Sequence, residues 1–298
     1  MSITKYAILC TVVEVGSLTK AATILNLTQS AVSHAILSLE KDCGFPLLIR
    51  AKSGIQLTTN GERIYQYMRE ILKWQEMLQQ EIDLLHGIQT GTVRVGTFTS
   101  VSSQWLPGVI KAFHQEFPAI QIKLREGDYA EIKNWITSGV VDFGFITLQG
   151  QSQLDTIPLK KDRMVCIVSS EHPLTEAPSV SLTALSNEPF IMPKWGGDDE
   201  IETMIKEHKT KLNIKYEIAE EQAIIGMVQH GLGISILPEM VLSRLPDTVR
   251  VIPIEEEPYR LIGIAAPSLS ELSPAASRFL QAIQDWLRLQ HLLDDSRS

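Results

Sequence analysis

Apolar residues recur with a helical period over the first part of the chain. The segment from Thr4 to Val15 is predicted to form an amphipathic helix. Its apolar face consists of Tyr6, Leu9, Cys10 and Val13. Ser17 suits the N-cap of a second helix, and Thr28 suits the N-cap of a third after Asn26-Leu27 break the pattern. Two helices joined by so short a turn predict a helix-turn-helix.

The third helix has two unlike faces. Apolar residues make up one of them: Ala31, Val32, Ala35, Ile36 and Leu39. The opposite face is mostly short and polar: Gln29, Ser30, Ser33, His34 and Leu37. Such a face suits a helix that lies against base edges in the major groove of DNA. For the helix taken alone, a solvated face on a core helix is the simpler interpretation.

A hairpin is predicted directly after this helix. Gly44 ends the helix as a C-cap would. Short strands are expected at 47–49 and 55–57, around a turn that holds Arg50 and Lys52. A hairpin in this position is a wing, and we assign its two basic residues to the phosphate backbone of DNA. Ordinary surface charge is the alternative interpretation of both residues.

A long helix is predicted from Thr59 or Asn60 to about residue 85. Along it, seven positions recur at steps of four and three: Ile64, Met68, Ile71, Gln75, Leu78, Ile82 and Leu85. All but Gln75 are apolar, so the pattern favours a seam that pairs two such helices in a dimer. The alternative is a helix that packs on its own domain. Gly87 and the segment 89–91 then suggest a hinge.

From Thr92 onward, strands are predicted to alternate with helices. This pattern is typical of a mainly parallel sheet covered by helices. Sites in such sheets form at the carboxyl ends of strands. The first such end is Thr97 to Val101, where hydroxyl groups and free helix amides would make an anion site.

Composition and charge fit a chain of two or three domains. The 298 residues carry a net charge of −8. Residues 1–60 hold five Lys or Arg against three Asp or Glu, whereas residues 91–298 hold nineteen against twenty-seven. A positive N-terminal end on an acidic body fits a DNA-binding segment attached to a part that avoids DNA. With no apolar run that could span a bilayer and no export signal, we expect a cytoplasmic protein without a membrane partner.

Residues that often carry chemistry show no catalytic pattern. The cysteines Cys10, Cys43 and Cys166 fall far apart on apolar segments, and we expect buried, inert thiols. The seven histidines lack metal-ligand spacing. Nucleophile, phosphate-loop and dinucleotide motifs are also missing. We therefore predict no catalytic residue, no metal and no cofactor.

One long stretch closely resembles the LysR-type transcriptional regulators. It reads GSLTKAATILNLTQSAVSHAILSLEKDCGFPLLIR and is followed by LTTNGERI. Later, SSEHPL, MVQHGLGISILPE and SPAASRFLQAI stand where that family has similar runs. The resemblance covers nearly the whole chain. It implies an α+β multidomain fold: an N-terminal winged helix-turn-helix, a long linker helix and a C-terminal two-lobed α/β effector domain of the type II periplasmic-binding-protein type.

The resemblance also implies domain boundaries. The winged helix-turn-helix would occupy 1–58, the linker helix and hinge 59–90, and the effector-binding domain 91–298. Lobe I would take 91–162 and 267–298, and lobe II would take 163–266. Two crossover strands would join the lobes, near Lys160–Val165 and Leu261–Ala266, with a small effector bound between them.

The residues expected to contact DNA lie in the helix-turn-helix and the wing: Ser17, Thr28, Gln29, Ser30, Ser33, His34, Arg50 and Lys52. The chain departs from the family in having no Lys or Arg between Ala21 and Glu40. The family often has Arg where His34 stands. Phosphate attraction from the third helix should therefore be modest, and specificity should come from Gln29, Ser33 and His34.

The residues expected to hold the effector follow strand ends in both lobes: Thr99, Ser100, Val101, Asp128, Tyr129, Thr147, Met192, Lys194 and Trp195. Ser100 stands where the family often has a ligand-binding serine. A plain N-cap is the alternative for Ser100, and core packing is the alternative for Tyr129 and Trp195. If Ser100, free helix amides and Lys194 converge, the effector is a small anion such as a carboxylate.

The sequence therefore predicts a sequence-specific DNA-binding transcriptional regulator controlled by a small-molecule effector, and not an enzyme. The expected partners are double-stranded DNA with an interrupted palindrome, the effector, further copies of the chain in a homodimer or homotetramer, and RNA polymerase. An uncharacterised enzyme, or an intracellular solute-binding protein with an accessory helix-turn-helix domain, is the alternative.

Overall fold

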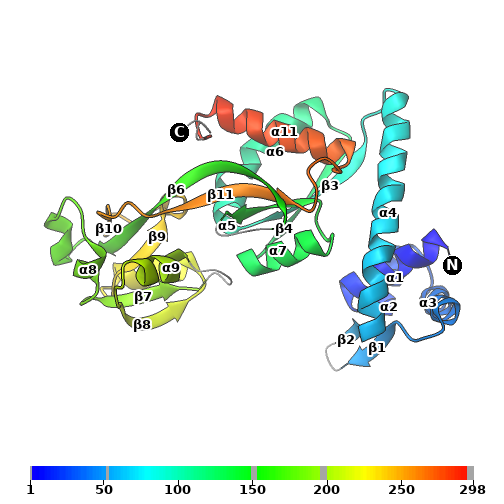
Figure 1. Ribbon diagram of the computed structural model, residues 1–298, viewed down its shortest axis with the longest axis horizontal. Coiled ribbons are helices and arrows are strands. Elements are labelled where there is room, and N and C mark those ends of the chain that lie inside the picture. The colour runs from blue at the N-terminus through cyan, green and yellow to red at the C-terminus, as the bar shows by residue number, and fades with distance from the viewer. Residues whose placement is uncertain (1, 52–53, 149–152, 195–199, 294–298) are drawn as a thin grey trace. The chain divides into compact units, whose positions relative to one another are not determined.

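The computed structural model describes residues 2–51, 54–148, 153–194 and 200–293, with the backbone alone at Arg50, Ala51 and Glu200. Contacts between residues divide the chain into two compact units, Met1–Gly91 and Thr92–Ser298. We call them unit 1 and unit 2, and Figure 1 labels their helices and strands.

Unit 1 begins with three helices: α1 (Ile3–Val15), α2 (Leu18–Ile24) and α3 (Gln29–Cys43). An antiparallel hairpin of β1 (Leu48–Ala51) and β2 (Gly54–Leu57) follows, and then α4 (Thr59–Leu85). This is the predicted order of a winged helix-turn-helix and a long helix.

The predicted helix ends of unit 1 are confirmed in three places. Ser17 accepts a hydrogen bond from the backbone N–H of Lys20, and Thr28 accepts one from that of Ala31. Gly44 adopts the left-handed conformation, with φ of 81°, that ends many helices. These residues therefore set the limits of α2 and α3 by local hydrogen bonds and backbone freedom.

An apolar core joins the helices of unit 1 to the hairpin. Its buried members are Tyr6, Ile8, Leu9, Val12, Ala21, Ala22, Val32, Ile36, Leu39, Leu47 and Met68. The small side chains of Ala21 and Ala22 allow α2 to cross its neighbours closely. Ala31, which the pattern assigned to the apolar face of α3, is exposed instead because it lies at the edge of that face.

The hairpin is held at its base by α3 and α4. Glu40 Oε1 accepts hydrogen bonds from the backbone N–H groups of Leu47 (2.7 Å) and Leu48 (3.1 Å). A side-chain carbon placed on Gly61 would lie 2.2 Å from the carbonyl oxygen of Leu47. Glycine at this position is therefore what lets α4 begin so close to β1.

The apolar face of α4 has two parts. Thr58 caps the helix, one residue before the predicted Thr59. Met68 is buried in the core of unit 1 and Ile64 packs against it, so these two members of the predicted seam serve their own unit. Farther along, Gln75 and several large apolar side chains are exposed: Ile71, Trp74, Leu78, Ile82 and Leu85.

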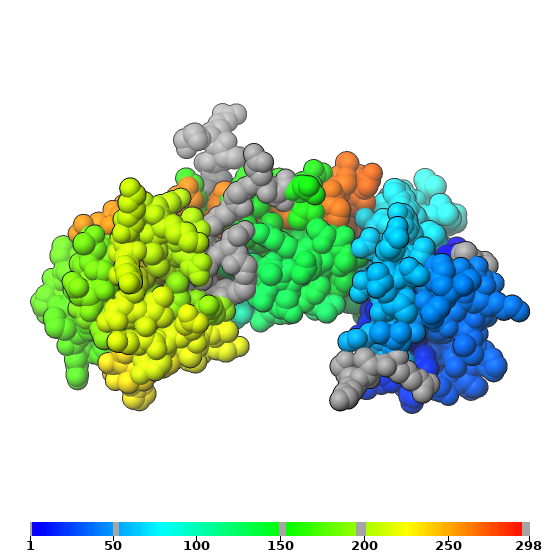
Figure 2. Space-filling view, turned by 60° about the horizontal axis from the view of Figure 1, so that its bottom comes forward, coloured from blue at the N-terminus to red at the C-terminus, as the bar shows by residue number. Residues whose placement is uncertain are grey.

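Unit 2 has two lobes with separate cores. Lobe I contains β3 (Gly91–Thr97), β4 (Ile120–Glu126), β5 (Phe143–Thr147), α5 (Thr99–Gln104), α6 (Leu106–Glu116), α7 (Tyr129–Thr137) and α11 (Pro274–Leu289). Lobe II contains β7 (Pro189–Pro193), β8 (Asn213–Ile218), β9 (Ser235–Pro238), β10 (Val249–Ile252), α8 (Leu182–Leu185), α9 (Glu200–Glu207), α10 (Glu221–Gln229) and the short turns η1 (Pro173–Glu176) and η2 (Glu239–Leu242). In the space-filling view, the yellow-green and yellow residues of lobe II gather into one continuous body (Figure 2).

Two strands run through both lobes, as the family resemblance implies. They are β6 (Asp155–Ser169) and β11 (Tyr259–Ala266), paired antiparallel with Arg260 opposite Asp162. The strand order is β10-β6-β11-β5-β3-β4, and β9 also pairs with β6. Ile262 and Ile264 belong to the core of lobe I, so the predicted end of lobe II at 266 is too late. The α/β class predicted for this unit is confirmed, but the prediction of a mainly parallel sheet is wrong. β6 pairs antiparallel with β9, β10 and β11, and β11 pairs antiparallel with β5, because the two crossover strands run in opposite directions.

Candidate functional site

The helix α3 presents a polar face outside the core of unit 1. Gln29, Ser30 and His34 are exposed, and Ser33 is partly buried. Thr28 closes the N-terminal end of this face, and its hydroxyl lies 3.1 Å from that of Ser30. Short polar side chains at the start of an exposed helix can approach the base edges of DNA closely.

Few basic groups surround this face. Lys5 Nζ donates hydrogen bonds to Ser38 Oγ (2.8 Å) and Asp42 Oδ2 (2.9 Å) on α3. The hydrogen bond from Lys5 holds the pKa of Asp42 below its usual value, so these two charges neutralise each other. Lys20 and Lys41 are exposed near the two ends of the helix-turn-helix. The modest attraction to phosphate groups that the sequence predicts for α3 stays a prediction.

The wing supplies the other predicted basic residues. Arg50 pairs with Ile55 across the hairpin. The side chain of Arg50 and the whole of Lys52 lie outside the described residues. Their assignment to the phosphate backbone stays a prediction.

A cavity of about 310 Å³ lies in unit 2, with walls from both lobes and from β11. Lobe I supplies Phe98, Thr99, Glu126, Gly127, Asp128 and Tyr129. Lobe II supplies Lys194, Ala219, Glu220 and Glu221, and β11 supplies Arg260. A neighbouring cavity of about 480 Å³ shares Thr99, Glu220 and Glu221 and adds Ser100. We call the two cavities together the cleft.

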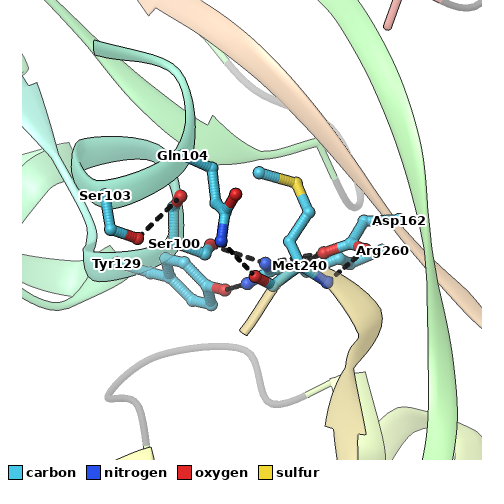
Figure 3. Close-up of polar contacts among 7 residues, drawn as sticks. All are labelled: Ser100, Ser103, Gln104, Tyr129, Asp162, Met240 and Arg260. Atoms are coloured by element: carbon cyan, nitrogen blue, oxygen red, sulfur yellow. Dashed lines mark hydrogen bonds and ion pairs between the residues drawn. The ribbon is translucent and has the colours of Figure 1, made fainter. Parts of the chain in front are cut away.

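The wall of the cleft contains a buried arginine that bonds to several elements (Figure 3). Arg260, 2 % exposed, donates from Nε to Asp162 Oδ2 (2.9 Å) on the neighbouring crossover strand. Its terminal nitrogens donate to Tyr129 Oη and Ser100 Oγ, each at 2.7 Å. The guanidinium also lies 5.2 Å from the ring centre of Phe98. Arg260 thus connects the crossover strands to α5 and α7 of lobe I.

The same network reaches lobe II through η2. Asp162 Oδ1 accepts a hydrogen bond from the backbone N–H of Met240 at 3.1 Å. Gln104, at the end of α5, donates from Nε2 to the Met240 carbonyl oxygen and to Ser243 Oγ. Burial raises the pKa of Asp162, and the guanidinium of Arg260 opposes that rise. Arg260 and Asp162 therefore form a buried ion pair that contacts both lobes.

Acidic groups dominate the described lining of the first cavity. Glu126 accepts hydrogen bonds from the hydroxyl groups of Thr99 and Ser102, which orient its carboxylate. Burial raises the pKa of Glu221, and the charge of nearby Glu220 adds to that effect. On the basic side, Lys194 lies 3.3 Å from Glu217 and is already paired.

The structure brings some of the predicted effector residues together and separates others. Thr99, Asp128, Tyr129 and Lys194 line the first cavity, and Ser100 lines the second. Val101 and Met192 are buried in the cores of lobes I and II, so their assignment to the effector is corrected to core packing. Thr147 is buried in β5 opposite Ile262. Trp195 lies outside the described residues.

Sequence reasoning missed the residues that decide the charge of the cleft. Arg260, Asp162, Glu126, Glu220 and Glu221 were not singled out. A signal did exist for Arg260, because it stands one residue before the apolar run LIGIAA of a crossover strand. A charged residue buried in such a strand needs a partner, and here the partner is Asp162.

The thiol groups fit the predicted inert role. Cys10 and Cys166 are buried, and burial raises the pKa of each to about 12. Cys43 is partly buried, and its pKa is also raised. At neutral pH these thiols are protonated and weakly nucleophilic.

The described residues also bear on metal sites and on membrane spans. Their His, Cys, Asp and Glu side chains include no group arranged to hold a metal ion. Within the same residues, every helix is too short or too polar to cross a lipid bilayer.

Comparisons with known proteins agree with this architecture. A family model described as a bacterial regulatory helix-turn-helix protein of the lysR family matches residues 3–62. A second model, the LysR substrate binding domain, matches residues 86–288. The chain is 34 % identical over 288 residues to the uncharacterized HTH-type transcriptional regulator YvbU of Bacillus subtilis (strain 168). The alignment covers 96 % of this chain and 98 % of that protein.

Solved structures show the same fold at lower identity. A full-length OxyR variant from Pseudomonas aeruginosa is 21 % identical, with a TM-score of 0.79 over 100 % of this chain and 99 % of that one. Full-length CbnR in complex with its target DNA is 18 % identical, with a TM-score of 0.67 over 96 % of this chain and 100 % of that one.

Proposed function

The chain belongs to the LysR family of bacterial helix-turn-helix regulators, and from this membership we propose that it binds specific DNA sequences and regulates transcription in response to a small molecule. Its relatives are transcriptional regulators, so no catalytic role is assigned. A bacterial transcriptional regulator binds DNA in the cytoplasm, so we place this protein there.

The polar face of α3 is the observation that carries the DNA-binding part of this proposal. Gln29, Ser33 and His34 lie near the start of a capped helix, outside the core of unit 1. Glutamine reads adenine by two hydrogen bonds, and serine bonds to several bases. We assign base contacts to these residues, and phosphate contacts to Lys20, Lys41 and the predicted wing residues Arg50 and Lys52.

The exposed stripe of α4 supports a dimer. Ile71, Trp74, Leu78, Ile82 and Leu85 recur at steps of three and four, and each is at least 40 % exposed. A monomer would leave these large side chains in water, whereas two paired helices would bury them. A dimer would present two copies of α3 to the half-sites of an interrupted palindrome.

The cleft of unit 2 is the proposed effector site. It has walls from both lobes, and its buried wall residue Arg260 bonds to lobe I directly and to lobe II through Asp162. A ligand there would favour one arrangement of the lobes and so change how the dimer meets DNA. The prediction of a small anion stays a prediction. It would use the hydroxyl hydrogen of Ser100, whose oxygen accepts from Arg260, and the ammonium of Lys194, which also pairs with Glu217.

The experiment that tests the proposal is a salt titration of DNA binding by the full chain. One fragment is the DNA just upstream of its own gene, and the other is a random sequence of equal length. We expect tighter binding to the upstream fragment, and a shallow salt slope because few basic groups surround α3. Equal binding to both fragments at every salt concentration contradicts sequence-specific recognition of this DNA.

A further inference from the structure

The lining of the first cavity of the cleft indicates the charge of a ligand that binds there. We propose that the effector carries a cationic nitrogen group, such as a protonated amine, held between Glu126 of lobe I and Glu220-Glu221 of lobe II. The inference rests on the proposed function, which supplies the reason to expect a ligand in the cleft. The side chains described below decide the chemical class of that ligand.

The balance of charge in the first cavity is acidic. Its described lining includes the carboxylates of Glu126, Asp128, Glu220 and Glu221 against the cations Lys194 and Arg260. Both cations are engaged by carboxylates that are not among the described lining residues. Lys194 pairs with Glu217 at 3.3 Å, and Arg260 pairs with Asp162 at 2.7 Å. The lining therefore presents an excess of negative charge to anything that enters.

The buried polar groups on the wall are arranged around a cation already. Ser100 Oγ and Tyr129 Oη both accept hydrogen bonds from Arg260, and these side chains are 2 % and 5 % exposed. Their acceptor lone pairs face the Arg260 guanidinium, so the cation inside this wall is already satisfied by protein groups. An anion would meet the neighbouring carboxylates, and like charges at close range repel.

The carboxylate of lobe I is held in place before any ligand binds. Glu126 is the last residue of β4, and its two oxygens accept hydrogen bonds from Thr99 and Ser102 of α5. A carboxylate that is already oriented loses little freedom when a ligand binds. The aromatic residues Phe98 and Tyr129 line the same cavity, and aromatic rings are favourable neighbours of ammonium groups.

The helix dipole of α10 offers a simpler reason for carboxylates at this place in lobe II, but it is not sufficient. Glu221 lies in the first turn of α10, where the helix dipole favours a negative charge. Burial nevertheless raises its pKa, and the charges of Glu220 and of Glu126 on the other lobe contribute. The helix start therefore does not compensate for the burial and repulsion of this carboxylate. A bound cation would do so, and it would favour an arrangement that brings the two lobes together.

The test uses the full-length protein and three probes with the same four-carbon skeleton: putrescine, succinate and butanediol. Thermal unfolding at constant ionic strength reports binding, and titration calorimetry gives the Kd. We expect putrescine to raise the Tm by about 2–5 °C at millimolar concentration, and the other two probes to leave it unchanged. Stabilisation by succinate alone, or by none of the three probes, overturns the inference.

Variants separate the cleft from general attraction to an acidic protein. Glu126→Gln and Glu221→Gln should each weaken putrescine binding at least about tenfold. The matched control Glu271→Gln removes an exposed carboxylate elsewhere in unit 2 and should leave binding unchanged. Equal loss in all three variants, or loss in none, also overturns the inference. Binding to the upstream DNA fragment is measured without any probe, so a failure of DNA recognition is seen separately from a failure of the ligand class.

Discussion

The exposed face of α3 and the cleft of unit 2 are assembled from the chain in different ways. The face of α3 comes from neighbouring residues on one helix, between Gln29 and Leu37. In the cleft, Arg260 bonds to Tyr129 and Ser100, which precede it by 131 and 160 positions. A side chain on the polar face of α3 can therefore change without disturbing the fold, whereas each polar group around Arg260 also supports the structure of its unit.

The largest expected effect tests whether Arg260 has that structural role. Arg260→Met leaves Asp162 buried without its cation, so we expect a loss of roughly 3–5 kcal/mol and a Tm lower by about 10 °C. Thermal and urea unfolding of the full chain measure this loss. The double variant Arg260→Met/Asp162→Leu should recover more than half of it, because no buried charge remains. A double variant as unstable as the single one would contradict the ion-pair account.

On α3 the expected effect is on specificity and not on stability. Gln29→Ala should weaken binding to the specific DNA fragment by about 1–3 kcal/mol, because base-edge hydrogen bonds are lost. Binding to random DNA and the Tm should stay as in the original chain. Competition binding with both fragments measures the difference. The control is Gln121→Ala, an exposed glutamine in unit 2. Equal losses on both fragments would move Gln29 to the phosphate-binding residues.

The exposed stripe of α4 resembles the face of α3 in coming from neighbouring residues on one helix. It resembles the cleft in depending on residues far away, because it is buried only when a second chain pairs with it. Leu78→Glu places a charge in the exposed stripe, where Leu78 is 62 % exposed. We expect the Kd of the dimer to rise at least about tenfold, with the helix itself intact. Analytical ultracentrifugation measures the change, and Gln66→Glu introduces the same charge at another exposed site on α4. Unchanged association in Leu78→Glu would assign self-association to other surfaces.

The smallest expected effect concerns the acidic side of the cleft without a ligand. Burial raises the pKa of Glu221 above its ordinary 4.5, so the folded state binds this proton more tightly than the unfolded state does. Protonation of Glu221 therefore stabilises the folded state at low pH, and this stabilisation is lost as the pH rises through the raised pKa of the folded state. Glu221→Gln should raise the Tm by about 1–3 °C near neutral pH, and by less as the pH falls toward about 4. A difference that is constant with pH would mean that the effect is not electrostatic.

The fold was largely predictable because its main signals are local or periodic. Ser17 and Thr28 begin helices and Gly44 ends one, each through groups within a few residues, and the structure has all three as predicted. The crossover strands and the closing helix were also expected, from apolar runs and from a family resemblance. The seam of α4 was predicted only in part, because a periodic pattern does not say that Met68 packs within its own unit.

The helix-turn-helix, the hairpin, the long helix and the α/β order of unit 2 can be predicted from sequence, because caps, turns and periodicity act between near neighbours. The tertiary structure alone decided the character of the cleft. Bringing Arg260 against Asp162, Ser100 and Tyr129 satisfies its guanidinium inside the protein. The same folding places Glu126 and Glu221 around one cavity. The physical reason is that the charge of a cavity depends on which distant groups pair with each other, and local sequence carries no record of that pairing.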